Sequence, residues 1–392
     1  MKKILFITGT RADFGKLKSL IQKVHKNKNY IINIFITGMH TLFKYGYTVD
    51  EVLKFCDYIG IDNSPKNICV FHNQDQNDKM DRVLLNTIDG LSKYINENKP
   101  DLIVVHGDRV EALAGSLVGM LKNIYVGHIE GGEFSGNIDE SIRHSISKQS
   151  HFHFVSNVEA EKTLIQLGEN KKNIYKIGSP DIDLMLSKKL PSFNRVKKYY
   201  NINFDKKKYG IILFHPVTTN AKETLVIVKS IIKSAVVLKK NFVIIYPNND
   251  EGKEIIFNQF LKSKIYLKRY IRAIPSMRFE YFLTLLRNSK VIIGNSSAGI
   301  REAPVYGVNS VNLGTRQNNR SKNQDIFNLS NNYFKLTGIL KDIFSIKEKN
   351  NLKKNVLEFG NGNSANNFIK ILNSKEFWKT SKQKLFYKTY EK

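Results

Sequence analysis

Cysteine is almost absent from this chain of 392 residues, which contains only Cys56 and Cys69. Two cysteines cannot build a disulfide framework, and the sequence has no Cys-x-x-Cys pair or Cys/His cluster of the kind that holds structural zinc. We therefore expect buried free thiols, a reducing compartment and no metal site.

Long apolar runs are also missing. The apolar residues 4–7 follow Met1 and two lysines as in a signal peptide, but the polar residues 8–11 end the run after four residues. That is too short for a secretion signal. No run approaches the roughly 18 apolar residues that a membrane-spanning helix needs. These absences predict a soluble cytoplasmic protein with no membrane partner.

Acidic residues are scarce, with 35 Asp and Glu against 62 Lys and Arg, so the formal net charge is +27. Such a charge suits a nucleic acid, an anionic membrane or a phosphorylated small substrate, and it also arises from a lysine-rich solvated surface. The lysines are scattered, and no RNP, KH, helix-turn-helix or zinc motif accompanies them. We therefore expect no nucleic-acid partner.

What the sequence does contain is an alternation of short apolar runs with helical patterns. Hydrophobic residues make up 41% of the chain, an ordinary value for a globular protein. In the first half we expect strands at 3–8, 31–37, 102–106 and 124–129, and helices at 14–26, 79–96, 109–121 and 139–149. Ser156 and Glu159 form a capping-box pattern before a further helix. Such βαβ alternation predicts a parallel sheet with helices on both faces.

The same alternation resumes in the second half. We expect strands at 210–215, 242–246, 291–294 and 310–313, and helices at 223–238, 280–288, 298–306 and 368–390. At roughly 150 residues per domain the length also favours two domains. The predicted fold class is α/β, with two Rossmann-like parallel-sheet domains at 1–180 and 209–365, a connection at 181–208, a C-terminal helix within 366–392, and a ligand cleft between the domains.

Polar residues that can carry chemistry follow several of these runs directly, where doubly wound sheets bind ligands. They occur at 8–11 with Lys16 in the next helix, at 106–109, at 128–132, at 215–216 and at 294–299. One strand end with a polar residue is unremarkable. Several that supply Arg, Asp, Glu, His and a Gly/Ser turn predict a ligand site.

The Gly/Ser turn is the clearest candidate for an anion site. Small residues between a strand and a helix let backbone N–H groups approach an anion, and Ser296 and Ser297 can add donors; a tight turn with a serine N-cap explains them equally well. Glu302 could accept hydrogen bonds from a ribose diol, or simply favour the helix dipole. No dinucleotide fingerprint or Walker loop is present.

A second candidate is a group of carboxylates. Asp139 and Arg143 share a helix face, as in an ordinary surface i,i+4 ion pair. However, only a short loop separates Asp139 from Glu130, so Asp108, Glu130 and Asp139 could share one site. Neighbouring carboxylates push each other's pKa values apart, which acid–base chemistry requires. Arg316 and Arg320 follow the last strand and suit a diphosphate or a surface loop.

Read together, these segments resemble the UDP-N-acetylglucosamine 2-epimerase family, and most closely its hydrolysing branch, which makes N-acetylmannosamine for sialic acid synthesis. The matching segments occur in the family's order, at 9–16, 106–109, 128–132, 138–144, 294–302 and 314–320. Asp139 looks like the hydrolysing type, because the non-hydrolysing branch usually has Glu there.

The resemblance implies a glycosyltransferase-B-like fold whose C-terminal helix returns to the first domain. It implies UDP held mainly by the second domain, with Ser296 and Ser297 at the diphosphate, Glu302 at the ribose and Phe282 beside the uracil. Further residues are implied around the diphosphate, namely Arg11, Lys16, His215 and Arg316, and others around the sugar, namely Asp108, Glu130, Asp139 and Arg143. It also implies a homodimer or larger homo-oligomer.

The implied reaction converts UDP-N-acetylglucosamine to N-acetylmannosamine and UDP through a glycal, without a cofactor. Two alternatives remain open from the sequence. One keeps the chemistry but acts on a UDP- or GDP-linked 2,4-diacetamido-trideoxy sugar of a legionaminic-type pathway. The other is a retaining nucleotide-sugar glycosyltransferase of the same architecture.

Overall fold

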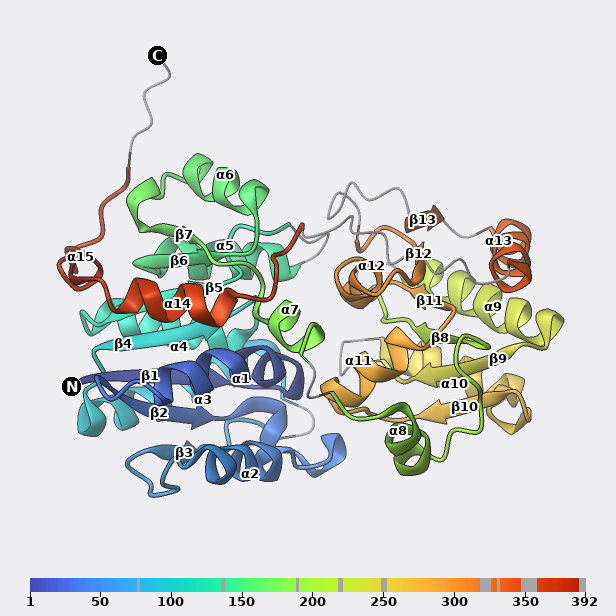
Figure 1. Cartoon of the computed structure of the whole chain (residues 1–392), viewed down its shortest axis with the longest axis horizontal. Coiled ribbons are helices and arrows are strands. Elements are labelled where there is room, and N and C mark those ends of the chain that lie inside the picture. The colour runs from blue at the N-terminus through green and yellow to red at the C-terminus, as the bar shows by residue number, and fades with distance from the viewer. Residues whose placement is uncertain are drawn as a thin grey trace, which may run out of the picture. The chain divides into compact units, whose positions relative to one another are not determined.

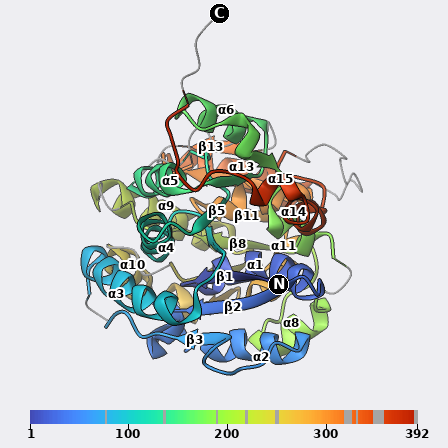
Figure 2. The ribbon, with the colours of Figure 1, turned by 90° about the vertical axis from the view of Figure 1, so that its left-hand side faces the viewer.

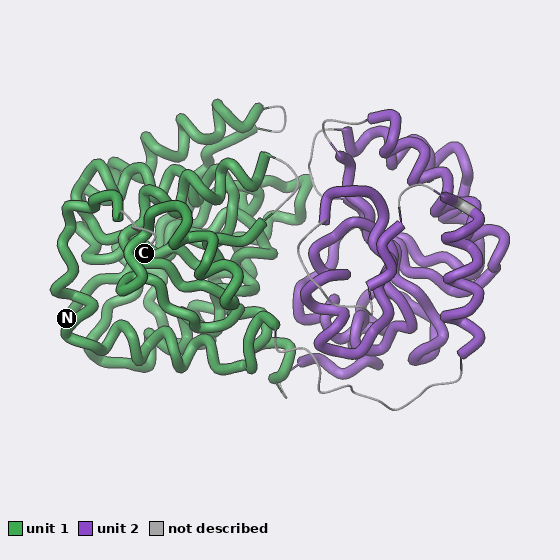
Figure 3. The backbone as a smooth tube through the Cα atoms, turned by 90° about the horizontal axis from the view of Figure 1, so that it is seen from above, with its two compact units in different colours: residues 1–187, 358–392 green, residues 188–357 purple. Residues whose placement is uncertain are grey.

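The computed structural model describes residues 1–75, 78–134, 138–187, 190–217, 221–247, 252–317, 326–329, 332–346 and 358–387. The chain divides into two compact units, which Figure 3 shows in green and purple: unit 1 comprises residues 1–187 and 358–392, and unit 2 comprises residues 188–357. Residues 358–365, assigned to the second domain from the sequence, thus group with unit 1. The chain passes between the units twice.

Unit 1 is built on a parallel sheet with the strand order β3-β2-β1-β4-β5-β6-β7. The strands are β1 Lys2–Thr8, β2 Tyr30–Ile36, β3 Ile68–Val70, β4 Leu102–His106, β5 Tyr125–Ile129, β6 Phe152–Val155 and β7 Ile174–Lys176. The strand order reverses at β1 and β4, which are neighbours. In such sheets the crevice at the carboxyl ends beside the reversal is the usual ligand site.

Helices cover both faces of this sheet. They are α1 Arg11–His25, α2 Val49–Ile59, α3 Met80–Asn98, α4 Val110–Leu121, α5 Ile138–Gln149, α6 Val158–Gln166, α7 Pro180–Met185, α14 Ser364–Leu372 and α15 Lys375–Trp378. Alternate residues of β1 enter two different cores, Ile4 and Phe6 under α1, α2 and α14, and Leu5 and Ile7 under α3 and α4. Figure 2 shows these helices on opposite sides of the sheet.

Unit 2 repeats the architecture with the strand order β10-β9-β8-β11-β12-β13. Its strands are β8 Tyr209–Leu213, β9 Asn241–Ile245, β10 Ile271–Ile274, β11 Val291–Gly294, β12 Asn309–Leu313 and β13 Ile326–Leu329. Its helices are α8 Phe193–Tyr200, α9 Ala221–Leu238, α10 Lys253–Ser263, α11 Phe279–Arg287, α12 Glu302–Val305 and α13 Tyr333–Ser345. The predicted pair of Rossmann-like parallel-sheet domains is confirmed (Figure 1).

Three local predictions are wrong for identifiable reasons. The expected helix at 298–306 is a 3₁₀ turn, η5 Ser297–Gly299, followed by the short α12, because the Pro304 ring clashes with the carbonyl four residues earlier in a continuous helix. The expected helix at 368–390 is split into α14 and α15 by a new N-cap at Ser374. Asn157, rather than Ser156, caps α6, while Ser156 donates to the Glu133 carboxylate.

The C-terminal segment completes unit 1. Helix α14 lies beside α1 (Figure 1), and α15 follows it over the sheet. The Phe368 ring packs on Phe154 at a centroid distance of 4.7 Å, and the Phe377 ring stacks on Phe152 at 3.9 Å. Residues 379–387, named here the C-terminal strap, continue along the same unit, where the Tyr387 N–H donates to the Gly168 carbonyl.

Candidate active site

Glu130 lies at the centre of a polar cluster at the carboxyl end of β5. Its side chain is 4% exposed, and its Oε2 atom lies 3.3 Å from Lys16 Nζ and 3.1 Å from His106 Nε2. Its backbone has a φ of 63°, a left-handed conformation that costs a non-glycine residue about 1 kcal/mol or more and is concentrated at functional sites. The structure therefore holds this predicted site residue in place at an energetic cost.

Asp108 and Arg143 form an ion pair next to this cluster. The Arg143 side chain is 5% exposed and the Asp108 side chain 25%, and Arg143 Nη1 also donates to the Glu133 carbonyl at 2.9 Å. Arg143 is thus buried and holds a partly exposed carboxylate. The sequence had also allowed an ordinary ion pair at the surface, in which Arg143 would be exposed. Asp139 lies half-buried in the first turn of α5; its approach to Asp108 and Glu130 stays a prediction.

His128 fixes the loop that carries Asp108. The buried imidazole bonds the Gly107 carbonyl through Nε2 at 2.7 Å and the Ser147 hydroxyl through Nδ1 at 3.0 Å. Burial lowers the pKa of His128 to about 3, and the nearby His153 and Arg143 add to this effect. The imidazole is therefore neutral, with Nε2–H donating to Gly107 and Nδ1 accepting from Ser147.

This neutral histidine predicts a loss of stability in acid. Because its pKa is about 3 in the folded protein and 6.5 as the ordinary value, its stabilisation is complete above about pH 6.5 and is lost as the pH falls toward 3. The free energy of unfolding should fall by about 1.4 kcal/mol per pH unit from this group. Urea denaturation of wild type and His128→Gln between pH 7.5 and pH 5 measures the difference in slope. Equal slopes would contradict the assignment.

Lys16 and Arg11 both have carboxylate partners within unit 1. Lys16 Nζ lies 3.4 Å from Asp181 Oδ2 as well as beside Glu130. Arg11 makes two contacts with Glu51, at 3.1 Å from Nε and 2.9 Å from Nη2. To contact a diphosphate, as predicted from the sequence, either cation would have to share or exchange these partners.

The structure adds residues to this cluster that the sequence did not single out. Ser179 and Asp181 follow β7 and contact Glu130 and Lys16 respectively. The sequence placed Ser179 at the end of the first domain and Asp181 at the start of the connection, and the signal for both was their position after a short β-branched and aromatic run. His106 stood within a recognised motif without an assigned role.

The predicted nucleotide residues lie in unit 2. The Asn295 side chain joins the ends of β8 and β11, because it accepts from the His215 N–H at 2.7 Å and donates to the His215 carbonyl at 2.8 Å. Gln317 donates to the Asn295 carbonyl at 2.9 Å. His215 is thus fixed beside the Gly294–Gly299 turn, and Arg316 lies on the neighbouring loop. The predicted site residues therefore form two sets, one on each unit.

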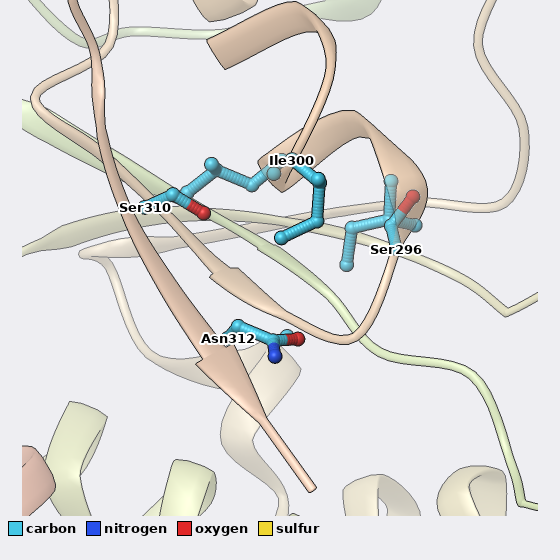
Figure 4. Close-up of a pocket in the computed structure, with 8 residues that line it drawn as sticks. Ser296, Ile300, Ser310 and Asn312 are labelled. Carbon is cyan, nitrogen blue, oxygen red and sulfur yellow. The ribbon is translucent and has the colours of Figure 1, made fainter. Parts of the chain in front are cut away.

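A small pocket lies at this turn. Ser296 and Ile300 line it from the turn, and Ser310 and Asn312 line it from β12, as Figure 4 shows. Ser296 caps η5 by accepting from the Ala298 N–H at 3.3 Å. Glu302 at the start of α12 and Phe282 on α11 are both buried. The turn thus has the serine N-cap that was one interpretation of the sequence, and its role as an anion site stays a prediction.

Gly294 is required by this turn. Its φ is +142°, and a Cβ atom there would lie 1.9 Å from the Leu213 carbonyl oxygen. Gly294→Ala should therefore force β8 and β11 apart and lower the free energy of unfolding by about 3 kcal/mol or more. Urea denaturation measures this loss.

Gly338 on α13 provides a matched control, since a Cβ atom there meets nothing within 4 Å. Gly338→Ala should leave the protein equally stable or stabilise it by about 0.5–1 kcal/mol. If both variants lost the same stability, steric clash would not be the cause at Gly294.

Two features are absent from the described residues. They contain no group of three or more His, Cys, Asp or Glu placed to hold a metal ion. Nor do they include a helix that is long and apolar enough to span a membrane.

Known proteins resemble the chain over nearly its full length. The family model described as UDP-N-acetylglucosamine 2-epimerase matches residues 22–373. A UDP-N-acetylglucosamine 2-epimerase of Neisseria meningitidis serogroup B is 44% identical over 392 residues, covering 98% of this chain and 99% of the relative. A UDP-N,N'-diacetylbacillosamine 2-epimerase (hydrolyzing) of Legionella pneumophila is 31% identical, covering 85% and 86%.

Solved structures share the fold. The UDP-GlcNAc 2-epimerase of Methanocaldococcus jannaschii in complex with UDP-GlcNAc and UDP superposes with a TM-score of 0.76 at 22% identity, covering 94% of this chain and 99% of that one. A Neisseria meningitidis UDP-GlcNAc 2-epimerase bound to UDP-GlcNAc gives 0.75 at 19% identity, with the same coverage. The chain belongs to the UDP-N-acetylglucosamine 2-epimerase family.

Proposed function

We propose that this protein is a hydrolysing 2-epimerase that converts UDP-N-acetylglucosamine to N-acetylmannosamine and UDP, in the cytoplasm and for sialic acid synthesis. The observation that carries the proposal is the 44% identity to the Neisseria meningitidis 2-epimerase over 98% of this chain. The match covers both units, and so spans the segments that contain the predicted sugar carboxylates and the Gly/Ser turn. A homo-oligomer and the absence of nucleic-acid and membrane partners are parts of the same proposal.

The three carboxylates predicted at the sugar, Asp108, Glu130 and Asp139, suit this reaction. The C-2 hydrogen of the sugar is not acidic, because no carbonyl is adjacent. Cleavage of the anomeric C–O bond leaves an oxocarbenium-like centre, which acidifies C-2, and the bonding electrons depart with UDP. A carboxylate then removes the C-2 proton and a glycal forms. Asp108, anchored by Arg143, and Asp139 serve this elimination.

Hydration completes the reaction. Water bonds to C-1 and loses a proton, while C-2 receives a proton from the opposite face, which gives the manno configuration. Glu130 serves this step. Its contacts with Lys16 and His106 place a cation and a second titratable group beside it.

We assign the nucleotide mainly to unit 2. Ser296 and Ser297 hold the diphosphate, Glu302 the ribose and Phe282 the uracil, with His215 and Arg316 beside the diphosphate. Support comes from the Asn295 bridge, which fixes His215 next to the turn. On unit 1 the diphosphate ligands would be Arg11 and Lys16.

The 31% identity to the Legionella pneumophila enzyme favours a second candidate with the same chemistry. In that case the substrate is a UDP- or GDP-linked diacetamido-trideoxy sugar. A retaining glycosyltransferase of the same architecture differs from both, because it needs an acceptor.

Proton NMR in deuterated water separates these candidates. The protein is incubated in parallel with UDP-N-acetylglucosamine and with UDP- and GDP-linked diacetamido sugars, without an acceptor. We expect free N-acetylmannosamine with deuterium at C-2 from the first substrate. Turnover of a diacetamido sugar alone would establish the second candidate. Protium retained at C-2, or a strict acceptor requirement, would overturn the proposed mechanism.

A further inference from the structure

The Ser179 hydroxyl lies between two buried carboxylates. Its Oγ atom is in hydrogen-bond contact with Glu130 Oε1 and with Asp181 Oδ1. All three residues are at most 3% exposed. The arrangement joins Glu130, at the end of β5, to Asp181 on α7.

The number of hydrogen atoms available for these two contacts depends on whether the carboxyl groups are protonated. A serine hydroxyl has one hydrogen to donate and two lone pairs, whereas an ionised carboxylate can only accept. If both carboxylates were ionised, the single hydrogen would have to be divided between them. If one carboxyl is protonated, it donates to Ser179 Oγ while Ser179 donates to the other carboxylate, and both contacts become full hydrogen bonds.

The charges of the cluster favour the protonated form. Lys16 is shared by the two carboxylates, at 3.3 Å from Glu130 and 3.4 Å from Asp181. His106 contacts Glu130 at 3.1 Å. The buried His128, which lies in β5 two residues before Glu130, is neutral. Two neighbouring buried anions are costly to desolvate even where they share an ammonium group. One proton held between them removes a negative charge and keeps every contact.

We propose that Glu130, Ser179 and Asp181 form a proton relay that stores one proton between the two carboxyl groups. This inference rests on the proposed function and deepens it. The Asp181 proton passes to Ser179 Oγ as the Ser179 hydrogen passes to Glu130, and Glu130, now protonated, gives a proton to C-2 of the glycal. When Glu130 then takes a proton from the water that adds at C-1, the reverse transfer reloads Asp181. The relay therefore ends each hydration unchanged.

The backbone fixes the serine for this role. The Ser179 N–H donates to the Phe359 carbonyl at 2.6 Å. The preceding Gly178 packs against Gly360 so closely that a Cβ atom on Gly360 would lie 2.9 Å from the Gly178 Cα. Ser179 is therefore held by the returning chain.

Infrared difference spectroscopy tests the shared proton without any turnover. At neutral pH, wild-type protein minus Asp181→Asn should show the C=O stretching band of a protonated carboxyl group, and wild type minus Glu130→Gln should show it too. Asp183→Asn is the matched control on the same helix, since Asp183 caps α14 through the Ser364 and Ala365 N–H groups. Absence of the band from both difference spectra would overturn the relay, because the hydrogen is then shared between two ionised carboxylates.

Kinetic measurements test whether the relay takes part in hydration of the glycal. Ser179→Ala should slow hydration of the glycal by about 10²-fold and release free glycal, with UDP formation much less affected. Ser179→Thr, which retains the hydroxyl, should restore hydration. The wild-type solvent isotope effect should vary non-linearly with deuterium content, as expected for several protons in motion, and linearly in Ser179→Ala.

These results separate a proton relay from a purely structural role of Ser179. Equal losses of UDP formation and hydration in Ser179→Ala, with no rescue by Ser179→Thr, would show a structural role and overturn the relay. If wild type releases no UDP from any nucleotide sugar while the carboxyl band is present, the proposed function fails but the shared proton stands.

Discussion

Asp108→Asn should lower the rate of UDP formation from UDP-N-acetylglucosamine by about 10²–10⁴-fold, the usual contribution of a general acid–base group. Asparagine keeps the shape of the side chain and can still accept a hydrogen bond from Arg143, but it cannot take a proton from C-2. The buried Arg143 also retains its bond to the Glu133 carbonyl, so the protein should remain folded. A coupled assay for UDP, with circular dichroism of the same sample, measures both properties.

Asp101→Asn is the matched control for this experiment. Asp101 immediately precedes β4, whereas Asp108 follows its other end, and Asp101 is likewise a partly exposed carboxylate paired with a cation, Lys2, at 2.8 Å. Its loss should leave the rate of UDP formation unchanged. Full activity of a folded Asp108→Asn protein would remove Asp108 from the elimination step.

Glu169→Ala should greatly reduce stability. The Glu169 carboxylate is 2% exposed and lies 2.6 Å from Lys384, 2.9 Å from Lys148 and 2.9 Å from His153. Burial alone would raise its pKa, but His153 and Lys384 outweigh this effect and lower the pKa to about 2. The residue is therefore ionised at neutral pH, and its removal leaves Lys384 without a counter-charge.

Breaking a buried ion pair by removing one partner costs about 3–5 kcal/mol, and we expect the lower end of that range because Lys148 is partly exposed. Urea denaturation measures the loss. Hydrogen exchange should also show faster exchange in the C-terminal strap, since Lys384 joins it to the Ser147 and Ser150 carbonyls at the end of α5.

Glu159→Ala is the control for this second prediction. Glu159 forms an exposed ion pair with Lys162 at 3.3 Å on the same unit, and exposed pairs contribute at most about 1 kcal/mol. If the free energy of unfolding fell equally in the two variants, burial of Glu169 would not be the cause of its effect.

Burial made some of the strands predictable from composition. Strand β4 was predicted at its observed bounds, because a parallel strand covered on both faces is apolar throughout. The edge strand β3, with Val70 exposed, lacks that signal and was missed. Helix α12 was overextended because the apolar pattern outweighed Pro304 in the prediction.

The candidate site was predictable only in part. Motifs at strand ends pointed to Asp108, Glu130 and Ser296, since the carboxyl edge of a parallel sheet is readable from the order of the strands. The contact between Arg143 and Asp108 was not readable, because it depends on how α5 packs against α4 and β5 rather than on helical spacing. Asp181 lay in a stretch that resembled a linker.

The return of the chain to unit 1 also affects the order in which the protein can form during synthesis. Phe368 and Phe377, which cover Phe154 and Phe152, are made only after all of unit 2, residues 188–357. At the usual rates of translation, unit 1 waits about 10–40 s for them with an aromatic surface uncovered. The second domain can thus fold before the first is complete, which reverses the usual N-terminal-first order. The interval before the last helices emerge is when the nascent chain is most exposed to aggregation.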